Sequence, residues 1–514
     1  MSIKKTLALV AALTLISTAF VGCGPKDDSS KSSTGSSSSK TDDKSSEDGD
    51  SSGGDTAEIS LPTDGDTFTV MSWNDEFPKM VANYYIPDEG GTVEIKPGEG
   101  ETIVDEDGNP VLDDDGNEKK KDLVVASLGE TNYKAQFFGV GGGSASQYYD
   151  TYFMSGEDVD LYCVEADFAL SYLESNNAAP LSDVGLTKDD FSKNYDYTLE
   201  IGTIADGTLK GVSFQAAPGG FVYRKDLAET YLGVKTPEEM QEKVKDWKTF
   251  EATAKTVYEK SGDKKTALTS TLGGIWQVFS SARNEAWVTN DKLNISDDVT
   301  NFLTFAKDLT DKGYVTKVNQ WSDSWFALGQ TDQTMGYFVS TWGLKDTGTT
   351  SGNGFMTDSA GAVGGATYGQ WNICEGPQSY FWGGTWLVVP PSCDNADLAK
   401  GVIEYFCKKD DTMKKYAEAT GDFVNNKDVM AALVAAKTNS NGNLGGQDQF
   451  QVLNKVAEKI TMDSKLITEY DASVKASFQT VYGDYVEGKH ASVEAAIEAF
   501  KKDVISKNTQ LTVD

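Results

Sequence analysis

The sequence contains a single histidine, His490, among its 514 residues. A histidine-centred catalytic triad or a histidine-rich zinc site needs partner residues that this chain does not offer. Only five cysteines are present, and no two of them form a C-x-x-C pair, which argues against a metal cluster. We therefore expect a protein without a metal site or cofactor.

Positive charge is also scarce, with 46 Lys and Arg against 79 Asp and Glu and a formal net charge of −33. Phosphate backbones are bound by clustered cations, so this balance excludes a nucleic-acid binder that works by general electrostatics. Hydrophobic residues make up 39% of the chain and aromatic residues 11%, which is enough for a folded core. The length predicts two or three domains.

No stretch of the sequence clearly reaches the length of a transmembrane helix. Lys4 and Lys5 precede an uncharged apolar run over residues 7–21, a pattern typical of a secretory signal peptide. Residues 19–23 read AFVGC and resemble a bacterial lipobox, although Phe20 replaces the usual Leu. We predict a signal peptide over residues 1–22 and lipid modification of Cys23. An ordinary signal peptide followed by an incidental cysteine is the alternative.

The segment after Cys23 has almost nothing to bury. It consists mainly of Ser, Asp, Lys, Gly and Thr, and such a composition cannot offset the entropy lost on ordering. We predict a disordered tether over residues 23–65. The protein would then face outward from a bacterial cell membrane and touch the bilayer only through its lipid.

Polar residues follow two expected strands, residues 67–73 and residues 159–164. In α/β sheets, ligands bind beyond the carboxyl ends of the strands, so these positions are candidate ligand contacts. Helix capping is the alternative role for such residues. The candidates are Asn74, Asp75, Glu76, Glu165 and Asp167.

An acidic insertion over residues 86–132 interrupts this pattern. It contains two Asp-Gly-Asn sequences between short apolar runs, which indicates an exposed β-hairpin. Its alternating carboxylates also suggest calcium, but the EF-hand pattern fails because Pro110 occupies the position that requires Gly. A solvated hairpin is the favoured interpretation.

Several separated segments carry a resemblance to a known family. In chain order they are residues 72–77 (SWNDEF), 159–167 (VDLYCVEAD), 221–227 (FVYRKDL), 247–250 (WKTF), 335–337 (MGY), 340–343 (STWG), 376–377 (GP), 382–386 (WGGTW), 420–423 (TGDF) and 488–489 (GK). With this order, roughly residues 66–505 resemble the family 1 extracellular solute-binding proteins, the lipoprotein sugar receptors of ABC importers.

The resemblance implies an α/β, two-lobed periplasmic-binding-protein fold with a hinge and an interlobe cleft. The N-terminal lobe would comprise residues 66–180 and 368–409, and the C-terminal lobe residues 181–367 and 410–514. It also implies a monomer without catalytic activity that captures a carbohydrate, an oligosaccharide in our interpretation. The cleft would close over this ligand and deliver it to the permease subunits of an ABC transporter.

Tryptophan supports a sugar ligand on chemical grounds, because sugar rings stack their apolar faces on aromatic rings and offer hydroxyls to polar groups. Several indoles lie beside glycines, which allow close approach of a ligand. Core packing is the alternative for each of them. The candidates are Trp276, Trp321, Trp325, Trp342, Trp382 and Trp386, with Arg283 as a further polar contact.

Two other functions remain open at this stage. A secreted glycoside hydrolase would use two cleft carboxylates, and a peptide receptor could share the same fold. The sequence does not identify the sugar, its linkage or its length. It also leaves open whether Cys163, Cys374, Cys393 and Cys407 form disulfides.

Overall fold

The computed structural model describes residues 58–513, except residues 101, 103–109, 111, 113–115, 121–122, 140–144 and 345–366. The predicted signal peptide, Cys23 and most of the predicted tether lie outside the described residues. The end of that tether differs from its prediction. Ile59 and Thr63 form isolated β-bridges with Val184 and Asn395, because the apolar side chains around Ile59 pack against the main core.

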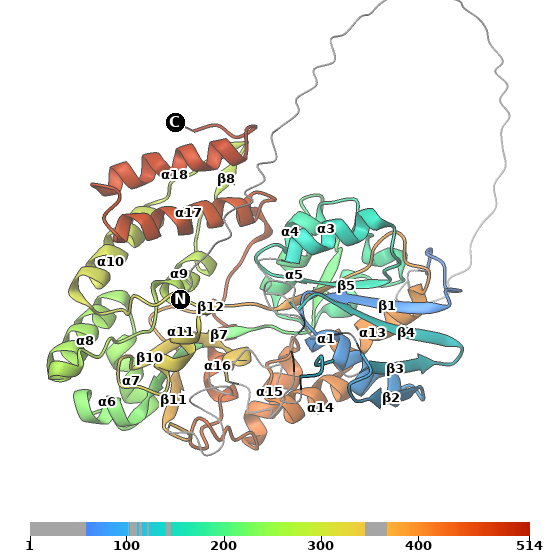
Figure 1. The fold of residues 1–514 in the computed structure, drawn as a ribbon, viewed down its shortest axis with the longest axis horizontal. Coiled ribbons are helices and arrows are strands. Elements are labelled where there is room, and N and C mark those ends of the chain that lie inside the picture. The colour runs from blue at the N-terminus through green and yellow to red at the C-terminus, as the bar shows by residue number, and fades with distance from the viewer. Residues whose placement is uncertain are drawn as a thin grey trace, which may run out of the picture. The chain divides into compact units, whose positions relative to one another are not determined.

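The larger of the two main sheets has seven strands in the order β2-β3-β4-β1-β5-β13-β6 (Figure 1). β1 is parallel to β4 and β5, whereas β13 is antiparallel to β5 and β6. The expected strands at residues 67–73 and 159–164 are confirmed as β1 and β5. The bounds are β1 Thr67–Ser72, β2 Thr92–Lys96, β3 Leu123–Leu128, β4 Thr131–Phe137, β5 Leu161–Glu165, β6 Gly211–Ser213 and β13 Thr385–Val388.

The smaller sheet is built around β7, all seven residues of which are buried. β10, β11 and β12 each pair antiparallel with β7. A short hairpin of β8 and β9 stands apart from both sheets. The bounds are β7 Pro218–Arg224, β8 Val288–Thr289, β9 Lys292–Leu293, β10 Gly336–Ser340, β11 Trp371–Cys374 and β12 Tyr380–Phe381.

Helices cover both sheets, and Figure 1 shows α3 and α4 on one side of the larger sheet and α1 on the other. Several helices begin at a capping side chain, as where the Thr271 hydroxyl accepts the Gly274 N–H at the start of α9. The helices of the first half are α1 Glu76–Met80, α2 Ile86–Asp88, α3 Ala145–Ser155, α4 Ala169–Leu173, α5 Asp196–Gly202, α6 Lys225–Leu232, α7 Pro237–Val244 and α8 Trp247–Lys260, with a π-helical turn at Val81–Tyr85. Those of the second half are α9 Leu272–Ser281, α10 Asp297–Lys312, α11 Asp323–Leu328, α13 Ala396–Cys407, α14 Asp410–Thr420, α15 Lys427–Ala436, α16 Phe450–Ala457, α17 Asp471–Val486 and α18 Val493–Lys507.

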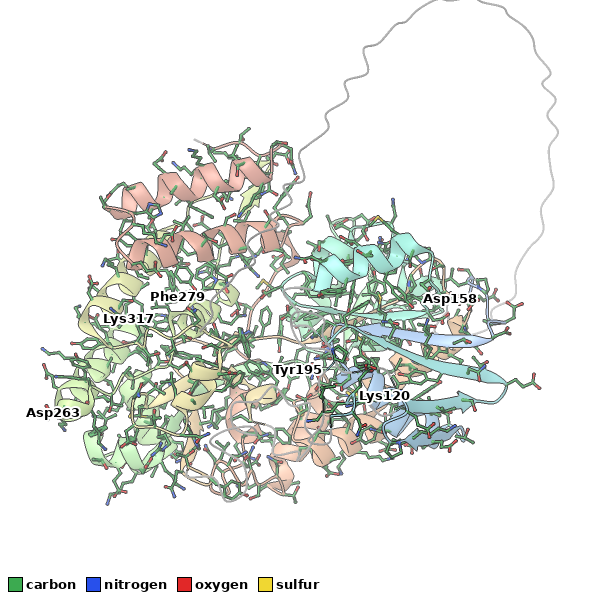
Figure 2. All side chains as sticks on the ribbon, in the orientation of Figure 1. Lys120, Asp158, Tyr195, Asp263, Phe279 and Lys317 are labelled. Carbon is green, nitrogen blue, oxygen red and sulfur yellow. The ribbon has the colours of Figure 1, made fainter. Side chains whose placement is uncertain are left out.

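Two hydrophobic clusters form the core. The larger cluster surrounds the seven-stranded sheet and includes Tyr195, and the smaller one lies among the helices around β7, with Phe279 packed against it. Both residues are labelled in Figure 2. None of the described helices combines the length and the apolar character needed to cross a bilayer. Over the same residues, no group of His, Cys, Asp and Glu side chains is arranged to hold a metal ion.

The four cysteines of the folded part are buried free thiols, which answers the question that the sequence left open. Burial raises the pKa of the Cys163 and Cys374 thiols above the ordinary value. They act as small apolar core residues.

The predicted acidic hairpin begins as β2 and β3, which pair antiparallel at the edge of the larger sheet. Isolated bridges between Thr102 and Lys120 and between Leu112 and Glu118 continue this pairing. Most of the Asp-Gly-Asn residues that suggested calcium lie outside the described residues.

The two sheets draw their strands from alternating parts of the chain, and the lobe boundaries at 180/181, 367/368 and 409/410 stay predictions. β6 still belongs to the larger sheet, whereas β11 and β12 belong to the smaller one. Residues of α14, α15 and α16 are buried in the larger cluster. Strands of two to four residues carry too little periodic pattern to reveal which sheet they join.

Candidate functional site

Two short segments carry the chain between the sheets. Residues 214–217 connect β6 to β7, and residues 382–384 connect β12 to β13. Both contain left-handed backbone, with φ of 49° at Ala217, 82° at Gly383 and 99° at Gly384. Glycine adopts such angles without strain, so the pair at 383–384 allows a sharp change of direction. A third segment, residues 458–470, joins α16 to α17.

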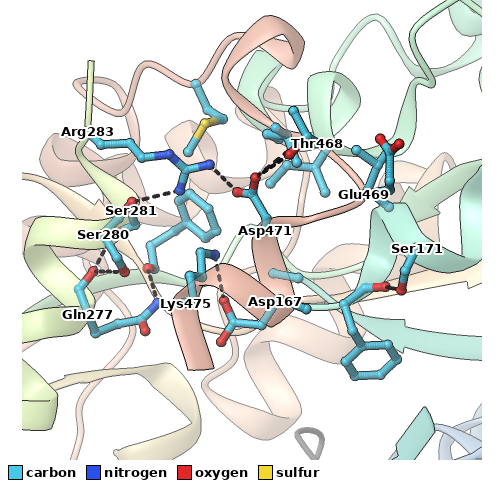
Figure 3. A pocket seen from close by; sticks show the side chains of 18 residues that line it. Asp167, Ser171, Gln277, Ser280, Ser281, Arg283, Thr468, Glu469, Asp471 and Lys475 are labelled. Atoms are coloured by element: carbon cyan, nitrogen blue, oxygen red, sulfur yellow. Dashed lines mark hydrogen bonds and ion pairs between the residues drawn. The ribbon is translucent and has the colours of Figure 1, made fainter. Parts of the chain in front are cut away.

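A pocket lies between residues that follow β5 and residues of α9 and α17 (Figure 3). Asp167 and Phe168 come from the first side, Gln277 and Arg283 from α9 and the turn after it, and Lys475 from α17. The Lys475 ammonium lies 3.0 Å from Asp167 Oδ1. This ion pair joins the end of a strand in the larger sheet to a helix that packs in the smaller cluster.

Arg283 is fixed in the wall of this pocket. Its guanidinium forms a buried ion pair with Asp471 and donates hydrogen bonds to the carbonyl oxygens of Ser280 (3.1 Å) and Leu466 (2.7 Å) (Figure 3). Thr468 donates two further hydrogen bonds to Asp471. Arg283 therefore connects α9 to the segment that leads into α17.

Three of the candidate indoles form one aromatic group, which we call the tryptophan group: Trp321, Trp342 and Trp382. Their ring centroids are 5.1 to 5.8 Å apart. The Trp342 indole N–H donates to the carbonyl oxygen of Trp382 at 3.0 Å. Trp321 is 48% exposed and has a left-handed φ of 69°, which is rare for a bulky residue and often marks a functional site.

Glu165 lies next to the tryptophan group. A Cβ atom placed on Gly383 would be 3.5 Å from the Trp342 indole nitrogen and 4.0 Å from Glu165 Oε1. The glycine thus leaves space between a carboxyl group and an indole ring. A sugar-binding site requires aromatic faces and hydrogen-bonding groups such as a carboxyl, beside backbone that leaves room for the ligand.

The electrostatic surroundings of Glu165 are unusual. Burial raises the pKa of Glu165 to about 8, and the negative charge of Asp167 adds to this shift. The Asp167 backbone N–H donates to Glu165 Oε2 at 2.8 Å, which opposes the shift but does not cancel it. Near neutral pH, Glu165 is therefore mostly protonated and able to donate a hydrogen bond.

We expect this carboxyl group to make the stability depend on pH. Since its folded pKa lies above that of an unfolded glutamate, about 4.3, its contribution is complete below that value and is lost as the pH rises toward 8. Thermal unfolding of Glu165→Gln should show a flatter pH profile than the wild type, and the variant should be the more stable protein above pH 8. Asp167→Asn serves as a control. It should move the pH range over which Glu165 loses its stabilising contribution to lower pH without abolishing the pH dependence. Parallel profiles for the wild type and Glu165→Gln would contradict this assignment.

The candidates after β1 have local partners. Asn74 Oδ1 accepts the Glu76 N–H at 3.1 Å, and Asp75 pairs with Lys79 at 2.5 Å. These residues lie at the start of α1, and the Asp75 side chain at its N-cap makes no capping hydrogen bond. All three are only partly buried at the carboxyl end of β1.

The other three candidate indoles are buried. Trp325 and Trp386 are each 1% exposed, and their indole N–H groups donate to Ser270 Oγ and to the Thr198 carbonyl oxygen. Trp276 is 3% exposed and packs on Phe302 and Phe478. The glycines near Trp276 and Trp386 did not indicate exposure of these rings, whereas Trp325, although buried, contacts the tryptophan group, with its ring centroid 5.1 Å from that of Trp321.

Sequence reasoning missed two polar residues. Lys475 lies within helix α17, and no local sequence pattern indicates that it lines a pocket. Gln320 precedes Trp321, and its buried Nε2 has no hydrogen-bond partner among the described residues. A side chain at Gly273 would collide with the Gln320 amide, so that glycine admits Gln320 next to the start of α9. The sequence signal available for Gln320 was its position beside a candidate tryptophan.

Comparison with known proteins identifies the class. Residues 129–444 match the model of the bacterial extracellular solute-binding protein family, and the chain belongs to this family. Its members are extracytoplasmic binding proteins, which confirms the resemblance found in the sequence. No curated protein sequence matches this chain.

Solved structures show the same fold. A family 1 extracellular solute-binding protein is 17% identical with a TM-score of 0.66, covering 85% of this chain and 99% of its own. An ABC transporter associated binding protein from B. animalis subsp. lactis Bl-04, in complex with beta-1,6-galactobiose, is 20% identical with a TM-score of 0.62, covering 88% and 100%. The galacto-N-biose-/lacto-N-biose I-binding protein from Bifidobacterium longum, in complex with lacto-N-biose, is 15% identical with a TM-score of 0.61, covering 88% and 100%. The predicted α/β, two-lobed fold is thereby confirmed.

Proposed function

We propose that this protein captures an oligosaccharide in a cleft between its two lobes and delivers it to the permease subunits of an ABC transporter. The observation that carries the proposal is the tryptophan group beside Glu165, at the point where residues 382–384 pass from one sheet to the other. The binding of sugars by two structural neighbours is consistent with this function.

The groups at the site suit a neutral sugar. The half-exposed ring of Trp321 offers a face for the C–H side of a pyranose, and protonated Glu165 can bond to its hydroxyls. The net charge of −33 disfavours a strongly anionic sugar. Asn74, Asp75 and Glu76 remain proposed contacts, at the carboxyl end of β1, which pairs in parallel with β5.

Closure of the lobes would be the signal that the permease recognises. The Asp167–Lys475 pair joins the two sides of the pocket, and both side chains keep contact with solvent. Such a pair contributes little energy by itself, so it can form and break as the hinge moves. We propose that the protein does this as a monomer.

The test is a binding screen of the purified protein with neutral oligosaccharides. A ligand should change the tryptophan fluorescence, raise the melting temperature by mass action and be recovered intact. Release of shorter sugars would instead establish the hydrolase alternative, for which Glu165 and Asp167 are the obvious pair of carboxyl groups. A response to peptides but to no sugar would establish a peptide receptor.

We also propose that the chain is anchored in the cell membrane through lipid on Cys23. Replacement of Cys23 by Ala is expected to move the protein from the membrane fraction to the medium, because one thioether-linked lipid site is the sole attachment predicted by the sequence. Fractionation followed by immunoblotting measures this. The control is Cys163→Ala, which changes a buried thiol and should leave the protein with the membrane. Retention of the Cys23→Ala protein in the membrane would refute the anchor.

A further inference from the structure

Asp422 is a buried carboxyl group that the proposed site does not use. It follows α14 within the TGDF segment at residues 420–423, one of the segments that carry the family resemblance. The residue is 0% exposed. Burial of a polar group is costly unless donors or acceptors of the protein replace water. The donors that surround Asp422 therefore indicate its role.

Donors from three parts of the chain reach this carboxyl group. Thr341 Oγ1 donates to Oδ1 at 2.6 Å, and Gln215 Nε2 donates to Oδ2 at 2.6 Å. The Tyr416 hydroxyl, from α14, donates to Oδ2 at 3.2 Å. Gln215 belongs to the segment between β6 and β7, and Thr341 follows the last residue of β10. One carboxyl group thus holds together the end of α14, a connection between the two sheets and the end of a strand in the smaller sheet.

Thr341 links this carboxyl group to the tryptophan group. It directly precedes Trp342 in the 3₁₀ turn Thr341–Gly343. Thr341 is 1% exposed, whereas Trp342 is only partly buried. Because the two residues share one turn of backbone, a shift of Thr341 would move the Trp342 indole with it. A binding residue is held in a defined orientation by such supporting bonds.

Gln215 links the carboxyl group to the same aromatic rings by a second route. Its segment continues to Ala217, whose carbonyl oxygen accepts the Trp382 N–H at 3.0 Å. The Trp342 indole N–H in turn donates to the Trp382 carbonyl oxygen at 3.0 Å. The two routes meet at this bond and form a closed cycle of contacts that begins and ends at Asp422.

We infer that Asp422 is a positioning residue of the tryptophan group. It fixes the orientation of the Trp342 and Trp382 rings through Thr341 and Gln215, and it is not itself a ligand contact. The consequence for sugar affinity rests on the proposed function. The orientation of the rings can be tested without any ligand.

Two substitutions of Thr341 separate its hydrogen bond from its packing. Thr341→Val keeps the shape of the side chain and removes the donor, whereas Thr341→Ser keeps the donor and removes a methyl group. In protein labelled with 5-fluorotryptophan, the fluorine resonances of Trp342 and Trp382 are assigned by their absence in the corresponding Phe variants. Without ligand, Thr341→Val should shift both resonances, and Thr341→Ser should leave them at the wild-type positions. In an Asp422→Ala background, Thr341→Val should cause no further shift.

Affinity is the second readout. For a glycan found in the screen, Thr341→Val should weaken binding about five- to tenfold, as expected for the loss of one hydrogen bond, and Thr341→Ser should bind like the wild type. Asp160→Asn is the matched control. Asp160 is also 0% exposed and accepts the N–H groups of Thr69 and Asn395, but it precedes β5, whereas Glu165 ends that strand. Its replacement should lower the melting temperature and change neither the resonances nor the affinity.

Three results would overturn the inference: both resonances unmoved in Thr341→Val, equal shifts in Thr341→Val and Thr341→Ser, or unchanged glycan affinity in Thr341→Val. If no glycan binds even to the wild type, the proposed function fails. The resonances of the ligand-free protein then still decide whether Asp422 positions the tryptophan group. If Asp422→Ala does not fold, the pair of Thr341 variants gives the same decision.

Discussion

Replacement of Arg283 by Met is expected to lower the free energy of unfolding by about 3–5 kcal/mol, because it leaves Asp471 as an unpaired buried charge. Both side chains of the pair are at most 7% exposed, so water cannot take over the role of the guanidinium. The same change removes the hydrogen bond from Arg283 to the Leu466 carbonyl oxygen, which ties the turn after α9 to the segment before α17. Denaturant unfolding, followed by far-UV circular dichroism, measures the loss.

A surface ion pair and a double variant serve as controls for Arg283. Lys489 pairs with Asp484 at 2.7 Å, but its side chain is 59% exposed, so Lys489→Met should leave the unfolding midpoint unchanged. Arg283→Met combined with Asp471→Leu should recover most of the lost stability, since no charge then remains buried. If the single and double variants were equally unstable, packing and not charge would account for the effect.

Replacement of Trp321 by Ala is expected to weaken oligosaccharide binding by about 2 kcal/mol, or roughly thirtyfold, through loss of the stacking face. The fold should tolerate the change because the ring is 48% exposed. Trp and Ala both carry a Cβ, so the left-handed backbone at this position is equally strained in both proteins. Isothermal titration calorimetry with a glycan found in the screen measures the affinity.

A series of substitutions at Trp321 separates the contribution of its ring to the affinity from that of the surrounding residues. Trp321→Phe keeps a flat face and should retain most of the affinity. Melting temperatures measured without ligand show whether any variant has lost its structure. Unchanged affinity in Trp321→Ala would remove the tryptophan group from the proposed site.

The sequence was sufficient to predict the class of fold and the two strands that lead to the site. β1 and β5 are runs of buried β-branched and aromatic residues, and such runs are recognisable without a structure. β6 and β12 were not recognisable, since three and two residues cannot display a period. The sheet that each of these short strands joins was therefore not predictable.

Candidate site residues could be found where they lie close together in the sequence. Contacts between residues far apart in the sequence could not be predicted. Glu165 ends β5 and Asp167 lies two residues beyond it, whereas the partner of Asp167, Lys475, is 308 residues away. The indoles show a different limit. Composition indicated tryptophan as a ligand platform, but the exposure of Trp321 and the burial of Trp386 depend on packing that neighbouring glycines do not report.

The place of β13 in the larger sheet has a consequence for biosynthesis. This strand inserts between β5 and β6, although it is made long after both. The larger sheet therefore remains incomplete until about three quarters of the polypeptide has left the ribosome, and pairing at such long range is slow. During this delay the nascent chain stays unfolded. A secretion channel accepts a polypeptide in that unfolded state.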